Sequence, residues 1–310
     1  MTQQNSSSSS APLAKVVPKT ARAKRALDEQ GPKVIENSKK ALFLKGTSCS
    51  EVVSQAMQDL CSLKKPDAVF FGRRNNLHPF EMGKAETSIE FFSQKNDASL
   101  LVVGNHSKKR PHNICFVRTF DHRVLDMVEF SIVGYRSIFG IGGDLCGMGL
   151  KPAIMFQGEI FEQRREFKMI QNLFLDFFQG EHVTSLNLKG LESVICLTAL
   201  EDRILFRVYR VNLKKATDST TSPRVELSLM GPALDLKLGR IHFPSDDLMR
   251  QACRVPKELL AKKVKNISRD SIGDQFGRVH VGKQQIDKIQ TRKVKALKSN
   301  RDKELGIDEE

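Results

Sequence analysis

The stretch KPAIMFQGEIFEQRREFKMIQNLFLDFFQG, residues 151–180, holds two elements from which the fold can be worked out. It opens with an apolar run, KPAIMFQG, of the length and composition typical of a strand. The following segment has a stripe of large apolar side chains at helical spacing and ends at Gly180, with the stripe formed by Phe167, Ile170, Phe174, Phe177 and Phe178. We therefore predict a strand followed by an amphipathic helix whose aromatic stripe belongs to the core and not to a cofactor site.

The same order of elements is predicted on both sides of this stretch. Upstream, strands are indicated by KALFLKG, DAVFFG, SLLVVG, NICFVRTF and MVEFSIVGY, and a helix capped at Ser48 by SCSEVVSQAMQDLCSL. Downstream, strands are indicated by ESVICLTAL, DRILFRVYRVNL and PRVELSLMG. Each half therefore follows the order strand, helix, hairpin, strand. The sequence predicts an α/β protein built from two copies of one unit.

Length and composition are those of a globular core with basic extensions. The chain has 310 residues, a formal net charge of +14 and 40% hydrophobic residues, enough for one large or two small domains. No run approaches the roughly 18 apolar residues of a membrane helix, and the N-terminus lacks a signal-peptide core, so we expect the protein in the cytosol or nucleus. The cysteines are scattered, which favours reduced and mostly buried thiols: Cys49, Cys61, Cys115, Cys146, Cys196 and Cys253.

The excess positive charge lies at the two ends of the chain. Residues 1–45 carry nine Lys or Arg against three Asp or Glu, and residues 254–303 carry fifteen against five. Residues 1–30 are rich in Ser and then in basic residues, and we predict a disordered, basic N-terminal arm. A nearly neutral core with cationic arms favours a nucleic-acid partner. A membrane surface is a weaker alternative partner, because the basic segments lack an apolar face. A further alternative is that the positive charge serves solubility alone.

Three adjacent cations, Lys108, Lys109 and Arg110, stand in NHSKKRPHN between two predicted strands. We interpret them as a hairpin tip directed at RNA phosphates, with Arg73 and Arg74 in a similar position after a strand. The alternative is a solvated turn that discourages pairing at a sheet edge. The tail supplies further candidate RNA contacts, which could also form a nuclear-import signal: Lys262, Lys263, Lys265, Arg292, Lys293, Lys295 and Lys298. Aromatic residues are absent from these runs, which argues against base stacking.

No catalytic or metal-binding signature is found. The glycine-rich segment 139–149 lacks the spacing of a phosphate-binding loop and is predicted to be a flexible loop between the halves. His106, His112 and Cys115 have no fourth zinc ligand at the usual spacing. Asp121, Asp126 and Glu129 alternate with apolar residues and are predicted to form the wet face of a strand. An RNA-modifying or RNA-cleaving enzyme that uses these carboxylates remains the alternative function, and no cofactor is predicted.

The segment RVELSLMGPALDLKLGRI, 224–241, contains a Gly-Pro pair inside an apolar alternating stretch and resembles the Brix-domain family. The segments KKPDAVFFGRRNNLHPFE, NHSKKRPHNICFVRTFDHRVLDMVEF, GLKPAIMFQGE and KKVKNISRDSIGDQFGRVHVGKQQIDKIQTRKVKALK are similar to the branch of this family that serves the large ribosomal subunit. The resemblance implies two pseudo-symmetric α/β halves, about 31–150 and 151–245, in a domain spanning 31–245. A basic, partly helical C-terminal extension, 246–310, follows.

The resemblance also implies a function. It implies a non-enzymatic factor of the nucleolus, within the nucleus, that binds 5S rRNA and large-subunit precursor rRNA. Its expected partners are the regulator of ribosome synthesis protein, as heterodimer partner, and the two ribosomal proteins of the 5S particle, with no membrane contact. Two departures from the family pattern are Met230 before the Gly-Pro pair and Gln285-Ile286 in the tail, and the second leaves the tail contacts open.

Overall fold

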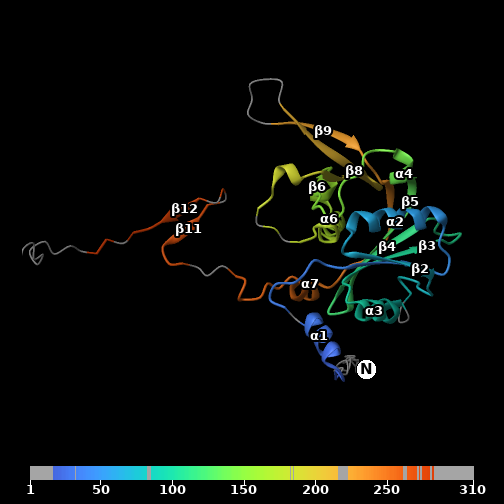
Figure 1. The fold of residues 1–310 in the computed structure, drawn as a ribbon, viewed down its shortest axis with the longest axis horizontal. Coiled ribbons are helices and arrows are strands. Elements are labelled where there is room, and N and C mark those ends of the chain that lie inside the picture. The colour runs from blue at the N-terminus through green and yellow to red at the C-terminus, as the bar shows by residue number, and fades with distance from the viewer. Residues whose placement is uncertain are drawn as a thin grey trace, which may run out of the picture. The chain divides into compact units, whose positions relative to one another are not determined.

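The computed structural model describes residues 17–31, 33–81, 85–181, 183, 185–215, 223–260, 264–270, 272, 274–279 and 281–282. The chain divides into two compact units, Met1–Val255 and Pro256–Glu310. Within the first unit, the first half consists of α1 (Ala21–Gln30), β1 (Ala41–Lys45), α2 (Glu51–Lys64), β2 (Ala68–Arg74), α3 (Ala85–Asn96), β3 (Leu100–Asn105), β4 (Asn113–Phe120) and β5 (Arg123–Arg136) (Figure 1).

The second half follows through α4 (Ile138–Ile141). It contains β6 (Ala153–Gln157), α5 (Ile160–Gln163), α6 (Arg165–Phe178), the 3-10 turn η1 (Leu188–Gly190), β7 (Ser193–Ala199), β8 (Arg203–Lys214), β9 (Arg224–Leu229), β10 (Ala233–His242) and α7 (Asp246–Ala252). The second unit has the short strands β11 (Ile267–Arg269) and β12 (Gln275–Gly277), which pair antiparallel. The strands predicted from apolar segments and the long aromatic helix are thus present.

The two halves share one ten-stranded sheet. Its order is β2-β1-β3-β4-β5-β10-β8-β7-β6, with β9 paired to β8. In the first half, β1 and β3 are parallel with α2 between them in sequence, and β3, β4 and β5 are antiparallel. In the second half, β6 and β7 are parallel around α6, and β7, β8 and β10 are antiparallel. The antiparallel β5–β10 pair joins the halves, so the predicted repeat is a pseudo-twofold arrangement about that pair.

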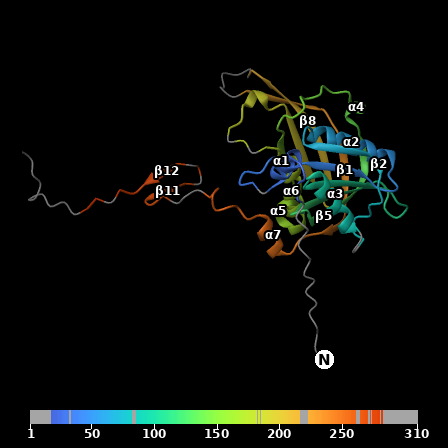
Figure 2. The same ribbon diagram turned by 60° about the horizontal axis from the view of Figure 1, so that its bottom comes forward.

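Helices cover both faces of the first-half sheet. The larger cluster of buried side chains joins one face of the sheet to α2 and α6, and the smaller one joins the other face to α3. Figure 1 shows α2 and α3 on opposite sides of the strands. In Figure 2 the β8–β9 ribbon, in yellow to brown, reaches beyond the helices toward the top of the view. Among the described residues, no helix is long and apolar enough to cross a membrane.

Helix α6 does not pack on the second-half sheet alone, as a reading of that half by itself would suggest. Phe174 lies 5.5 Å from Phe116 and 5.7 Å from Phe130, between ring centroids, and both partners belong to the first half. It also lies 6.5 Å from Phe206 on β8. The helix therefore covers the centre of the shared sheet and binds the two halves together.

The break between β9 and β10 is the Gly231–Pro232 pair. Gly231 has φ of +89°, and a Cβ there would lie 2.6 Å from Ile141 Cδ1, so only glycine fits without displacement. Proline next to it has no N–H to offer to a ladder, which suits a break between two strands. The motif thus marks the point where the chain turns from the projecting ribbon back into the sheet.

Several sequence-based boundaries differ from the structure. Residues 21–30 of the predicted disordered arm form α1, capped by Thr20, while residues 1–16 lie outside the described part. Helix α2 is capped by Ser50, which accepts from the Val53 N–H, and not by Ser48. Helix α3 was not predicted, and the loop 139–149 begins inside α4. Cys61, Cys115 and Cys196 are buried, whereas Cys253 is exposed, and all six cysteines are free thiols.

Candidate nucleic-acid interface

The carboxyl ends of β2, β1 and β3 meet at one end of the first-half sheet. These strands run parallel in this order, and β4 starts at the same end because it pairs antiparallel with β3, with Asn105 opposite Asn113. The loops that leave these strands, 46–50, 75–80 and 106–112, therefore lie beside one another. We call the basic residues carried by these strand ends and by the loop 106–112 the cationic end.

The predicted hairpin tip is present as a tight turn. The N–H of Ser107 donates to the Arg110 carbonyl at 3.0 Å, and the N–H of Arg110 donates to the Ser107 carbonyl at 3.1 Å. Lys108 and Lys109 consequently occupy the two central positions of the turn, the positions farthest from the sheet. Both side chains are exposed. Among the described residues, no carboxylate oxygen lies within 4.0 Å of either ammonium group.

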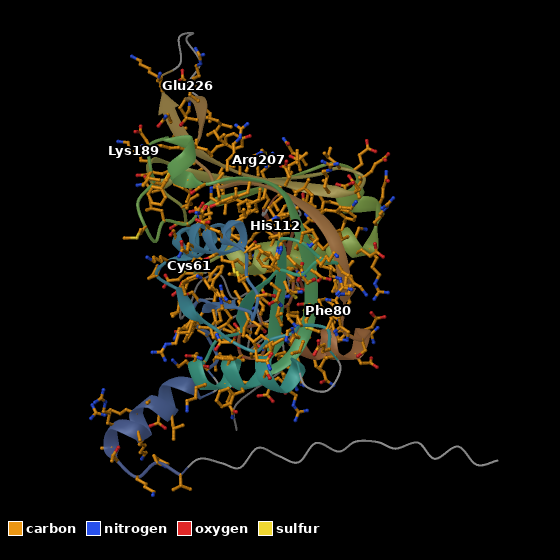
Figure 3. All side chains as sticks on the ribbon, turned by 90° about the vertical axis from the view of Figure 1, so that its right-hand side faces the viewer. Cys61, Phe80, His112, Lys189, Arg207 and Glu226 are labelled. Atoms are coloured by element: carbon orange, nitrogen blue, oxygen red, sulfur yellow. The ribbon has the colours of Figure 1, made fainter. Side chains whose placement is uncertain are left out.

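The turn is held at its base by the loop that follows β1. His106 donates its N–H to the Ser48 carbonyl at 2.7 Å, and Ser48 Oγ donates to the His106 carbonyl at 2.5 Å. His112 Nδ1 lies 2.9 Å from Ser50 Oγ, the cap of α2. His112, labelled in Figure 3, directly precedes β4. These contacts fix the base of the tip while leaving the two lysines outside.

Arg73 and Arg74 lie at the same end of the sheet, on the last two residues of β2. Both are exposed, and Arg74 is in register with Lys45 on β1. Lys45 Nζ lies 5.2 Å from the centroid of the Phe70 ring. Sequence reasoning missed Lys45, although its position as the last residue of a predicted strand was the available signal. The tip joins β3 and β4, which are two and three strand spacings from β2, so at about 4.8 Å per spacing the cations span roughly 10 to 14 Å across the sheet.

Arg110 differs from the two lysines because it faces a buried carboxylate. Arg110 Nε lies 4.0 Å from Glu129 Oε1, and Glu129 is 2% exposed. Arg240 donates to both oxygens of Glu129, at 2.6 Å from Nε and 3.0 Å from Nη2, and its guanidinium lies 4.4 Å from the Phe80 ring centroid. Asn113 also donates to Glu129. Arg110 is thus tied to the body of the domain as well as being part of the tip.

These contacts set the ionisation of Glu129. Burial by itself raises the pKa of this carboxyl, but the hydrogen bonds from Arg240 and Asn113, together with the charge of Arg240, outweigh burial. The pKa of Glu129 is therefore held below its ordinary value. The carboxylate stays ionised and keeps its partners in place at neutral pH.

The edge-protection alternative for the tip does not agree with the topology. Both strands of the hairpin are interior: β3 pairs with β1 and β4, and β4 pairs with β3 and β5. An interior pair offers no unpaired strand edge for charges to guard. The unpaired lysines at the tip need another explanation.

The three carboxylates considered as a catalytic set do not come together. Asp121 is exposed in the β4–β5 turn with φ of +50°, whereas Asp126 is 0% exposed and Glu129 lies on the opposite face of β5 from it. Arg118 donates to Asp126 and, at 2.7 Å, to Asn172 on α6. The predicted wet face was wrong, since Asp126 and Glu129 are buried and paired with arginines.

The histidines and the cysteine of the same region do not form a metal site. His106 and His112 are neighbours, with ring centroids 5.0 Å apart, but Cys115 lies on β4 in the smaller core cluster. Within the described part of the chain, no group of three or more His, Cys, Asp or Glu side chains could hold a metal ion.

Cations of the second half contrast with those of the cationic end. Arg207 pairs with Asp235 at 2.5 Å and Arg210 with Asp144 at 3.3 Å. Lys214 pairs with Glu226 at 2.7 Å on the β8–β9 ribbon, where Figure 3 labels Glu226 near its far end. Lys168 and Lys189, also in the second half, are exposed and make no ion pair among the described residues. The cationic end therefore stands out because its basic residues gather at one end of the sheet, and not because unpaired cations occur there alone.

Most of the tail candidates lie outside the described residues. These are Lys262, Lys263, Arg292, Lys293, Lys295 and Lys298. Lys265 is described and exposed, in the second compact unit. Their assignment as RNA contacts stays a prediction.

Comparison with known proteins identifies the family to which the chain belongs. The model of the Brix domain matches residues 46–240, which is more than half of the chain. The chain belongs to the Brix-domain family. The matched range includes β2 to β9, most of β10, the Gly231–Pro232 break and the cationic end apart from Lys45. The α/β architecture with a repeated unit, expected from the sequence, is confirmed.

Curated relatives of this Brix-domain chain match it over most of its length. It is 43% identical over 297 residues to "Ribosome biogenesis protein RPF2" of Saccharomyces cerevisiae, covering 93% of this chain and 86% of the relative. It is 45% identical over 261 residues to "Ribosome production factor 2 homolog" of Mus musculus, covering 84% of each. The Homo sapiens protein of the same name is 43% identical over 262 residues, with 84% of each chain covered.

Proposed function

We propose that this Brix-domain protein is a ribosome biogenesis factor that binds 5S rRNA and large-subunit precursor rRNA through its cationic end and its basic tail. It helps recruit the 5S ribonucleoprotein into the precursor of the large subunit and so supports maturation of large-subunit rRNA. The ribosome biogenesis role rests on relatives that carry that name at 43–45% identity. The 5S specificity rests on the motifs of the family branch.

The RNA-binding proposal rests mainly on Lys108 and Lys109, which lie at the centre of a turn whose base is held by hydrogen bonds. Their ammonium groups are exposed and lack a carboxylate partner among the described residues. Binding phosphate there releases counterions without disturbing an existing ion pair. Arg73 and Arg74 lie at the same end of the sheet and extend the surface.

The cationic end favours contacts to the sugar-phosphate backbone over contacts to bases. Lysine ammonium groups bind phosphate as point charges, and phosphate contacts fix position without reading sequence. Among the described residues of the tip, no aromatic ring is exposed for stacking between bases. The imidazoles of His106 and His112 face each other, and His112 contacts Ser50, the cap of α2. Specificity for one RNA would then come from its folded shape and from the partner proteins.

The proposed partners follow from the family branch. The regulator of ribosome synthesis protein is the proposed heterodimer partner, and the two ribosomal proteins of the 5S particle are proposed to meet this chain in the same assembly. The proposed location is the nucleolus. We propose that the protein acts without catalysis, since Asp121, Asp126 and Glu129 are separated or engaged with arginines.

Crosslinking in cells followed by sequencing of the bound RNA tests this function. We expect 5S rRNA and neighbouring large-subunit rRNA to dominate the recovered sequences, and the Lys108→Ala/Lys109→Ala variant to recover less of both. Recovery mainly of small-subunit precursor, or of no enriched RNA, would refute the proposal.

A further inference from the structure

An open pocket lies between α3 and the loop that follows β2. Its volume is about 340 Å³, and its lining consists of Asn75, Asn76, Leu77, Ser88, Phe91 and Phe92. The pocket is therefore on the α3 side of the sheet, away from α2 and α6 (Figure 1). Asn75 directly follows Arg73 and Arg74, so the pocket adjoins the cationic end.

Phe91 gives this pocket an aromatic ring that is open to solvent. The residue is 57% exposed, whereas Ile89 of the same helix is fully buried. The Phe92 ring lies 5.9 Å from the Phe91 ring, between centroids, with their planes at 78°, and 6.3 Å from the ring of Phe71 on β2. The exposed ring thus rests on a second ring that is packed against the sheet. A large aromatic surface held in this way suits stacking on a flat ligand.

The polar part of the lining is neutral. Asn75 fixes the loop, because its backbone N–H donates to the Lys45 carbonyl at 2.8 Å and its Nδ2 to the Arg73 carbonyl at 3.0 Å. Asn76 is exposed, and its Oδ1 lies 3.5 Å from Thr47 Oγ1. The lining contains no Lys, Arg, Asp or Glu. An aromatic face beside an amide, which offers a donor and an acceptor, matches a neutral planar group with hydrogen-bonding edges.

Cations come from both elements that form the neutral pocket. Arg73 and Arg74 precede the loop, and on α3 the exposed Lys95 has its Nζ 6.0 Å from the centroid of the Phe91 ring. Among the described residues, no carboxylate oxygen lies within 4.0 Å of the charged groups of these three residues. Basic side chains around an aromatic ring are the arrangement with which proteins hold unpaired nucleotides, phosphates on the cations and bases on the ring.

We propose that this pocket receives one unpaired base, from a bulge or loop of the RNA bound at the cationic end, which stacks on Phe91 while the amide of Asn76 forms hydrogen bonds with its edge. The inference rests on the proposed RNA-binding function and adds a base contact to phosphate contacts. Folded RNAs are read at bases splayed out of bulges and loops, whereas bases inside a helix have both faces covered. An apolar side chain of a protein partner would leave the amide and the three cations unused.

Two RNA hairpins with the same stem test the pocket, one fully paired and one with a single bulged uridine. Because the loss of one base–aromatic stack weakens binding by roughly 5- to 150-fold, we expect the full chain to bind the bulged hairpin at least about fivefold more tightly than the paired one. The preference should vanish in Phe91→Ala, persist in Phe91→Tyr, which keeps a ring, and shrink in Asn76→Ala. The matched control, Phe139→Ala, removes an 85% exposed phenylalanine from α4 and should keep the preference.

Photocrosslinking of the parent protein is independent of any variant. With 4-thiouridine at the bulge, the adduct should map to residues 75–77 or 88–92, and an adduct elsewhere would overturn the proposal. Equal binding of the two hairpins by the parent would also overturn it. A preference unchanged in both Phe91→Ala and Asn76→Ala would do the same and leave the pocket to a protein partner. A parent that bound neither hairpin would refute the RNA-binding function itself, and this inference with it.

Discussion

Replacing Lys108 and Lys109 together by alanine should weaken RNA binding without affecting the fold. The two ammonium groups stand at the centre of the turn and make no ion pair among the described residues, while the turn itself is closed by backbone bonds between Ser107 and Arg110. Exposed, unpaired charges contribute little to stability, so we expect a change of no more than about 0.5 kcal/mol per substitution in the free energy of unfolding.

The size of the binding effect follows from counterion release. Each lost phosphate contact lowers the slope of log affinity against log salt by about 0.7 to 0.9, and two contacts therefore by about 1.4 to 1.8. Between 50 and 200 mM salt, the ratio of parent to variant affinity should accordingly shrink by roughly 7- to 12-fold. The effect should be similar for RNAs of different sequence, because phosphate carries no base identity.

Fluorescence anisotropy with labelled 5S rRNA at several salt concentrations measures this slope. A matched control removes the same formal charge from the second half by Lys168→Ala/Lys189→Ala, both exposed side chains. The control should keep the parent slope and the parent melting temperature. If the tip variant and the control gave the same slope, the cationic end would not be the RNA site.

Three further predictions test other parts of the account. Glu129→Gln should remove a pH-dependent contribution to the free energy of unfolding. Because the pKa of Glu129 is depressed, the parent loses this stability as pH falls below the ordinary value of 4.5, and the unfolding free energies of the two proteins in urea should converge in acid. A difference that stayed constant with pH would contradict the pairing of Glu129. Phe174→Ala should lower the free energy of unfolding by about 3 to 5 kcal/mol, because its ring contacts both halves, and an unchanged melting temperature would refute that packing. Removal of residues 256–310 should leave the first unit folded but flatten the salt dependence of RNA binding, whereas an unchanged slope would restrict the tail to import.

The local hydrophobic pattern of the sequence was sufficient to predict most of the helices and strands. The continuous apolar run in KALFLKG predicted β1, which is buried on both faces, and the stripe around Phe174 predicted α6, which buries one face. Helix α3 was missed, since its two adjacent phenylalanines face differently, with Phe91 57% exposed and Phe92 packed against the smaller core cluster. The pairing of β5 with β10 joins segments about 100 residues apart in the chain and leaves no local signal.

The polar interior was the least predictable part. Asp126 and Glu129 lie on opposite faces of β5, and each is buried against an arginine: Arg118 on the neighbouring strand β4 for Asp126, and Arg240 on β10 for Glu129. Asn172, which holds Arg118 in place, is 54 residues away from it, and Arg240 is 111 residues away from Glu129. The tip lysines could be predicted because they lie on the surface, where neighbours from distant segments matter less.

The most direct test of the cationic end is to map which peptides of the full-length protein become covalently attached to 5S rRNA under ultraviolet light. Digestion and mass spectrometry of the purified complex would locate the nucleotide adducts along the chain. The account predicts adducts in residues 105–113 and 71–76, and their loss from the first segment in the Lys108→Ala/Lys109→Ala variant. Adducts confined to the second half, residues 151–245, would contradict it.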